Sequence, residues 1–197
     1  MITLPASPAP SRAVPALMDF GAVLRPGTGA GVLRIDRMGS RFRWDFEWPP
    51  MTQATARLFR AKLLMAREEG LRLPVPLMGI AQGLPGSPVV DGAGQAGKSL
   101  DLRGFAAGYV AREGYWLSIR DTAGQHYLHT VTATTVANGS GALANLPIFP
   151  ALRVPFADGN AVLFDAPVVE GVVTSDVSWE LTPGGLVQFA VTIEEAA

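Results

Sequence analysis

The chain has 197 residues, 48% of them hydrophobic, so it can bury one core of ordinary size or two small ones. Sixteen Lys and Arg residues against seventeen Asp and Glu residues give a net charge of −1, which argues against a dedicated binder of nucleic acids or anionic membranes. The absence of cysteine excludes disulfides, thiolate nucleophiles and zinc sites of the cysteine type. Twenty-two glycines, sixteen prolines and one long helical pattern predict a mainly β fold of short strands joined by turns.

The N-terminal segment, residues 1–16, is predicted to be an extended proline-rich arm. It lacks the basic start of a signal peptide, and prolines interrupt its short apolar pieces. Residues 18–24 and 31–36 then have the pattern of two short strands, separated by the turn-rich residues 25–29. The longest uncharged run, residues 130–152, is rich in Thr, Asn, Gly and Pro and is unsuited to spanning a membrane, so no membrane association is predicted.

Residues 41–48 form the clearest predicted strand, because charged and aromatic side chains alternate strictly along it. A strand places Phe42, Trp44, Phe46 and Trp48 on one face, which must be buried. The opposite face carries Arg41, Arg43, Asp45 and Glu47. The neighbouring arginines make an ion ladder a better interpretation than a catalytic carboxylate pair. Such a ladder can be solvated or interfacial, so these four residues are candidates for pairing with a neighbouring strand or, as a hypothesis, with a neighbouring subunit through ion pairs or strand pairing.

A single amphipathic helix is predicted after the two prolines that end this strand. Thr52 is a plausible N-cap, and Gly70 is well placed to end the helix near Glu69. On a helical wheel one broad side is apolar and is expected to pack on the aromatic face of the strand. That side consists of Ala54, Leu58, Phe59, Ala61, Leu63, Met65 and Ala66.

The sequence changes in character over residues 85–167, where short β-like runs show no helical period. A hairpin turn is predicted at residues 121–124. We interpret this segment as an inserted small β-barrel or sandwich domain. Residues 17–84 and 168–197 would then form one discontinuous β-rich domain with a packed α-helix.

Residues 92–99 match the phosphate-binding pattern G-x-x-x-x-G-K-S, in which Lys98 would reach phosphates and Ser99 would bind magnesium. Such a loop must lead into a helix, whereas residues 100–104 alternate like a strand. A nucleotide-binding protein is therefore the less favoured alternative.

No other pattern indicates catalysis. His126 and His129 are the only histidines, and positions three apart on a strand face opposite sides, so they cannot share a metal. No serine lies in a G-x-S-x-G setting. We predict no enzyme activity, cofactor or metal. Tyr115 and Trp116 support a second alternative, a carbohydrate- or receptor-binding module, since flat rings can stack on sugars.

The order of these pieces resembles the distal tail proteins of long-tailed, non-contractile (siphovirus-type) bacteriophages and related gene transfer agents. The resemblance is carried by the tryptophan-rich strand with its helix at residues 42–69, by residues 90–100, by the segments at 114–119, 127–128, 150–155, 158–159 and 166–167, and by the ending at 189–196.

The resemblance implies a structural protein of the phage tail tip. It implies a β-rich belt domain that assembles into a ring, of six copies in this family, between the tail tube protein and the tail-tip hub protein. An inserted domain would point outward. The expected location is the virion, after assembly in the host cytoplasm.

Overall fold

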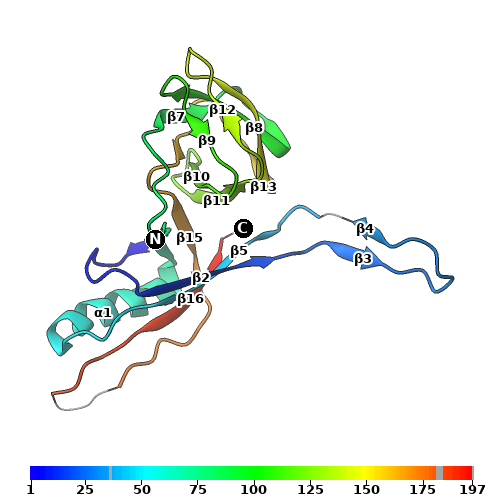
Figure 1. Cartoon of the computed structure of the whole chain (residues 1–197). Helices are drawn as coiled ribbons and strands as arrows, with labels where there is room; N and C mark the ends of the chain where they lie inside the picture. The colour runs from blue at the N-terminus through cyan, green and yellow to red at the C-terminus, as the bar shows by residue number, and fades with distance from the viewer. Residues whose placement is uncertain (36, 181–183, 197) are drawn as a thin grey trace.

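Two six-stranded sheets, two two-stranded sheets and one helix make up the chain in its computed structural model, which describes residues 1–35, 37–180 and 184–196 (Figure 1). The fold is therefore mainly β with one helix, and the predicted fold class is confirmed. Among the described residues, no helix combines the length and apolar character needed to cross a membrane.

The first sheet takes its strands from both ends of the chain. Its members, in spatial order, are β1 (Ile2–Thr3), β6 (Leu71–Pro74), β15 (Val168–Val173), β16 (Ala190–Glu195), β5 (Arg41–Glu47) and β2 (Arg12–Met18). All pairings are antiparallel except that of β1 with β6. We call the segments that build this sheet and its surroundings, residues 1–84 and 168–196, the terminal unit.

The N-terminal segment differs from the predicted arm, because residues 12–16 belong to this sheet. Strand β2 pairs with β5 over its whole length, from Arg12 opposite Glu47 to Met18 opposite Arg41. Pro15 is tolerated because an edge strand has a hydrogen-bonded neighbour on one side only. Strand β5 therefore pairs with part of the proline-rich segment, which was not predicted to belong to a sheet.

Helix α1 (Gln53–Glu69) begins and ends where the sequence predicts. Thr52 is the N-cap, with its side chain accepting a hydrogen bond from the backbone N–H of Thr55, and the N–H of Gly70 donates to the Ala66 carbonyl at 2.9 Å. The helix packs on the aromatic side of the first sheet, where the Phe59 ring lies 5.9 Å from Trp48 and 6.3 Å from Phe189.

The predicted apolar side of α1 is wrong in its extent. Only one narrow line faces the core, and it consists of Ala56, Phe59, Leu63 and Ala66. Ala54, Leu58, Ala61 and Met65, which the wheel grouped with the buried residues, are exposed. The wheel merged two separate apolar lines into one broad side.

The second sheet curls into a nearly closed barrel built from residues 85–167, which we call the inserted unit. Its order is β14 (Val162–Leu163), β10 (Trp116–Arg120), β11 (His126–Val131), β13 (Leu143–Phe156), β8 (Gln95–Phe105) and β7 (Gly86–Val90). A bridge between Val89 and Ala161 brings its two edges together. A two-stranded piece, β9 (Val110–Ala111) with β12 (Thr135–Val136), completes the unit. The turn predicted at residues 121–124 joins β10 to β11.

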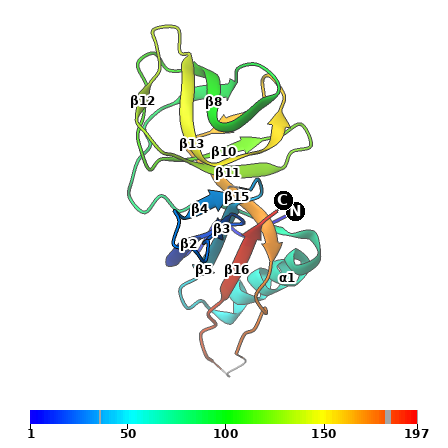
Figure 2. The ribbon, with the colours of Figure 1, turned by 90° about the vertical axis from the view of Figure 1, so that its right-hand side faces the viewer.

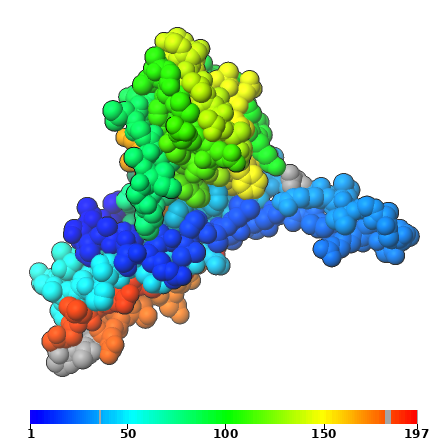
Figure 3. Space-filling model, viewed as in Figure 1, coloured from blue at the N-terminus to red at the C-terminus, as the bar shows by residue number. Residues whose placement is uncertain are grey.

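A long hairpin leaves the terminal unit beside the inserted unit (Figures 1 and 3). Its paired part is β3 (Ala22–Leu24) with β4 (Leu33–Ile35), close to the two strands predicted there, although Asp36 of the second lies outside the described residues. Figure 2 shows the inserted unit seated on one end of the first sheet, with α1 toward the other end.

Candidate functional site

The four charged residues predicted as a subunit interface lie together on one face of the first sheet. Asp45 accepts a hydrogen bond from the Thr192 hydroxyl at 2.7 Å and lies 3.8 Å from the Arg43 guanidinium. Glu47 is paired with Arg12 at 2.6 Å. The Arg41 guanidinium lies 5.1 Å from the centre of the Phe20 ring. All four side chains thus have a neighbour within the chain, on a face that remains partly exposed to solvent.

Strand pairing by these residues with another subunit is ruled out, which corrects one part of the prediction. Strand β5 is central, with β16 hydrogen-bonded on one side and β2 on the other. Its backbone groups are therefore used within the chain, and only the side chains could reach a neighbouring subunit. The opposite, aromatic face is buried as predicted, with Phe46 and Trp48 no more than 1% exposed.

The two residues predicted as a ligand platform lie where the units meet. The Trp116 ring is 5.0 Å from Phe42, edge to face, and 5.3 Å from Trp44. Tyr115 packs against the core of the inserted unit. Trp116 thus contacts the terminal unit with its ring, which limits its use as an open stacking surface for a sugar.

Trp116 also lines an apolar cavity of about 200 Å³ between the units, together with Trp44, Leu77, Met78 and Ile80. The amide side chain of Gln82 is a polar part of its wall, but it is already bonded to both backbone groups of Trp116 and to the Phe164 carbonyl. The hydrogen-bonding groups that a sugar requires are therefore sparse here.

The segment that matches a phosphate-binding loop is a turn followed by a strand. Lys98 and Ser99 lie inside β8, and α1, which precedes it in the chain, is the single helix of the part of the chain that the structure describes. The backbone N–H of Gly92 donates to the Asp158 carboxylate at 2.8 Å, and that of Gly94 donates to the Phe156 carbonyl at 3.1 Å. Two of the N–H groups in this turn are therefore bonded within the protein and unavailable to a phosphate.

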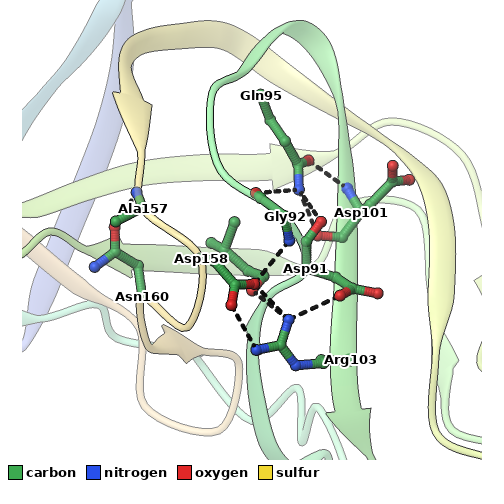
Figure 4. A network of polar contacts seen from close by, with 9 residues as sticks. Asp91, Gly92, Gln95, Asp101, Arg103, Ala157, Asp158 and Asn160 are labelled. Carbon is green, nitrogen blue, oxygen red and sulfur yellow. Dashed lines mark hydrogen bonds and ion pairs between the residues drawn. The ribbon is translucent and has the colours of Figure 1, made fainter.

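A polar network fixes this turn (Figure 4). Arg103 bridges Asp91 at 2.7 Å and Asp158 at 2.5 Å, and its hydrogen bond lowers the pKa of Asp158 to about 2. The Gln95 amide joins Asp91 to Asp101 by bonding to backbone groups of both. The carboxylates around the turn would repel a phosphate, so the geometry gives the nucleotide-binding alternative no support.

Both histidines are buried in β11 and lie in different surroundings. The His129 ring shares a hydrogen bond of 2.9 Å with the Pro150 carbonyl through Nδ1, which identifies Nδ1 as the protonated nitrogen. Burial lowers the pKa of His126 and of His129 to about 4. Among the described residues no group of three or more His, Cys, Asp or Glu side chains is arranged to hold a metal ion.

A buried carboxylate that the sequence did not reveal joins the two units. Glu195 accepts hydrogen bonds from the backbone N–H of Phe42 at 3.1 Å and of Leu128 at 2.7 Å, and it is paired with Arg153. The side chains of Glu195 and Arg153 are 0% and 6% exposed. Burial raises the pKa of Glu195, while Arg153 opposes that shift. Residues this far apart in sequence give no local signal of pairing.

A second ion pair, within the terminal unit, positions an arginine that reaches the inserted unit. Glu170 in β15 is paired with Arg72 at 2.6 Å, and Arg72 also donates to the Gly124 carbonyl in the turn between β10 and β11 at 2.8 Å. The inserted unit is thus held on the terminal unit by buried polar contacts as well as by the Trp116 cluster.

The surfaces left uncovered lie on the terminal unit. The hairpin is fixed at its base, where Asp19 is bonded to the Gly21 N–H at 2.9 Å and to Arg34 at 2.6 Å, and the Gly21 bond leads the lowering of its pKa. Beyond this base the hairpin exposes a series of large apolar side chains: Phe20, Val23, Leu24, Val32, Leu33, Ile35 and Met38.

Comparison of the sequence with protein-family models and with functionally curated proteins finds no match.

Proposed function

We propose that this protein is a structural ring subunit of a phage tail tip, a distal tail protein that joins the tail tube protein to the tail-tip hub protein. The observation that carries the proposal is the hairpin. Its exposed apolar side chains, among them Val32 at 63% and Leu33 at 58%, are not covered by any part of the described chain. Apolar surface of this extent on a projecting element is typical of an interaction site.

The hairpin supports a ring because a projecting element of one copy would pack on a different face of the next copy. A contact between a projecting element and another face of the next copy is heterologous, and such contacts close into a ring when the rotation between copies allows. The number six follows from the resemblance of the sequence to distal tail proteins. The charged face of β5 would add ion pairs between copies, through Arg41, Arg43, Asp45 and Glu47.

The hairpin can be tested by a pair of matched variants. Leu24 and Leu33 face each other across it, so L24E/L33E places two charges in the proposed contact. We expect wild-type protein to give rings with an open channel by negative-stain imaging and a ring mass by light scattering, and the double variant to give neither. V136E is the control, since Val136 is equally exposed at 57% but lies in the inserted unit.

Two outcomes would reject the proposal in its present form. The first is a ring that survives L24E/L33E, which would remove the hairpin from the contact. The second is a wild-type protein that fails to form rings even when mixed with tail tube and hub proteins. Rings that persist when Asp45 and Glu47 are both reversed in charge would remove the β5 face alone.

A further inference from the structure

The outward face of α1 carries a second apolar line that no part of the described chain covers. Ala54, Leu58, Ala61 and Met65 follow one another at intervals of four, three and four residues, so they align along the helix. At 3.6 residues per turn, this line lies about 150° around the helix from the buried line. Leu58 is 53% exposed and Met65 is 50% exposed. We call these four residues the outer line of α1.

Charged residues flank the outer line in an uneven way. Arg57 and Lys62 lie in the first two-thirds of the helix, and Glu68 and Glu69 end it. The first turn has no acidic residue. Because a helix dipole favours acidic groups at the N-terminus and basic groups at the C-terminus, two glutamates at the C-terminus do not serve the stability of the isolated helix. None of these four residues forms a salt bridge within residues 1–35, 37–180 and 184–196.

We propose that the face of α1 that carries the outer line packs against the same face of α1 in a second copy of this chain, with the two helices antiparallel and overlapping over residues 57–69. A two-fold axis between antiparallel helices places the same flank of both helices side by side. The N-terminal part of that flank on one helix then lies next to its C-terminal part on the other. A register that sets Ala61 opposite the partner's Met65, small against large, brings Arg57 level with the acidic end of the other helix. Basic and acidic ends then meet twice in one contact.

The charges favour this occupant over the hairpin of another copy. Arg34 of the hairpin is already paired with Asp19, and the remaining Arg25 and Arg37 would approach Arg57 and Lys62 on the helix with like charge. A second α1 instead brings Glu68 and Glu69 level with Arg57, and Met65 against Ala61. The self-complementary pattern therefore points to an isologous contact between copies.

The contact is distinct from the proposed ring contact and adds to it. One helix pair buries less area than a typical stable interface, so we expect weak association of free chains. Copies already joined through their hairpins would present several such helices at once, which strengthens pairing by multivalency. The helix pair would then join two assemblies, or two free chains, through a two-fold axis.

The first experiment measures this association without the ring, in the L24E/L33E background. Sedimentation at concentrations up to roughly 0.5 mM should show reversible dimers. Adding L58E and M65E should raise the dimer dissociation constant by roughly a hundredfold, because two apolar side chains of the contact become charged and Leu58 lies level with the acidic end of the other helix. Adding L84E is the control, since Leu84 is 88% exposed and is not part of α1. Circular dichroism checks that each variant keeps its fold.

The second experiment tests orientation by cross-linking. The natural chain has no cysteine, so each introduced cysteine is unique. A mixture of R57C and E68C, one of them carrying a size tag, should be cross-linked to each other by a short bismaleimide. Neither variant should be efficiently cross-linked to itself, because antiparallel packing places equal positions at opposite ends.

The results separate this proposal from the proposed ring. Monomers at all concentrations in the L24E/L33E background, together with absence of the mixed cross-link, would overturn the helix pair and leave the ring untouched. Self-cross-linking of R57C would overturn the antiparallel arrangement. Dimers that resist L58E/M65E would assign the contact to another surface.

Discussion

The inserted unit buries nearly all of its large apolar side chains, whereas the terminal unit leaves many of them exposed. Within residues 85–167, Val136 is the single large apolar side chain that is exposed. The terminal unit exposes many, on the hairpin, on α1 and around the cavity beside Trp116. A unit that buries its apolar surface is complete by itself, whereas one that leaves such surface open is a part of something larger. The contrast supports the proposal that assembly would use the terminal unit.

The two units also differ in how they depend on each other. Each has its own buried cluster, one centred on the β5 aromatics and α1 and the other inside the barrel. Leu128 of the inserted unit nevertheless belongs to the cluster of the terminal unit, and Trp116 packs against it. The buried Glu195–Arg153 pair and the hydrogen bond from Arg72 to the Gly124 carbonyl reinforce this junction. Substitutions at the junction should therefore lower the stability of both units, whereas substitutions inside one unit should affect that unit alone.

The largest effect is expected from Glu195→Ala, which should break the connection between the units. It leaves Arg153 buried without its counter-charge and removes the acceptor for the Phe42 and Leu128 N–H groups. We expect the free energy of unfolding to fall by about 3 to 5 kcal/mol, the usual cost of removing one partner of a buried pair. Urea unfolding followed by hydrogen exchange should show the units opening separately. Glu194→Ala, one position earlier on the more accessible side of β16, is the control; equal losses in both variants would contradict the assigned role of Glu195.

Acidification should weaken the inserted unit selectively, because it contains both histidines. In the unfolded chain a histidine binds its proton near pH 6.5, whereas folded His129 stays neutral down to about pH 4. The unfolded state therefore binds more protons between these values, and stability falls as pH is lowered through this window. His129 alone should account for a loss of about 3 kcal/mol between pH 7 and pH 4.

His129→Gln isolates this contribution. Glu195, whose pKa burial raises, acts in the opposite direction on acidification, so wild type and variant must be compared at each pH. The unfolding free energy of the variant should depend less on pH from 7 to 4 than that of the wild type. Identical pH profiles would show that His129 does not govern acid stability.

The smallest effect is expected from Thr52→Ala, which concerns the terminal unit alone. It removes the side-chain cap of α1, whose bond from the Thr55 N–H is long at 3.4 Å, so the loss should be about 1 kcal/mol or less. Hydrogen exchange should increase in the first turn of α1 and stay unchanged in the barrel. Thr52→Ser, which keeps the hydroxyl, is the control, and faster exchange spread across the barrel would contradict the independence of the two units.

The sequence by itself determined those features that depend on short-range order. Strict alternation identified the strand at residues 41–48 and its buried aromatic face, and the capping residues Thr52 and Gly70 identified both ends of α1. The turn at residues 121–124 and the strand-like context after Ser99 followed from local turn chemistry and periodicity. Each of these is fixed by neighbours a few residues apart, which a sequence displays directly.

Tertiary structure alone decided what each face of these elements meets. Strand β5 became central only because residues 12–18 returned to pair with it, and one helical wheel was compatible with either apolar line of α1 facing the core. The Glu195 contacts join positions 42, 128, 153 and 195, which no local pattern connects. Contacts between distant residues depend on the packing of the whole chain, so the surfaces that remain uncovered, and with them the candidate sites of assembly, became visible only in the folded molecule.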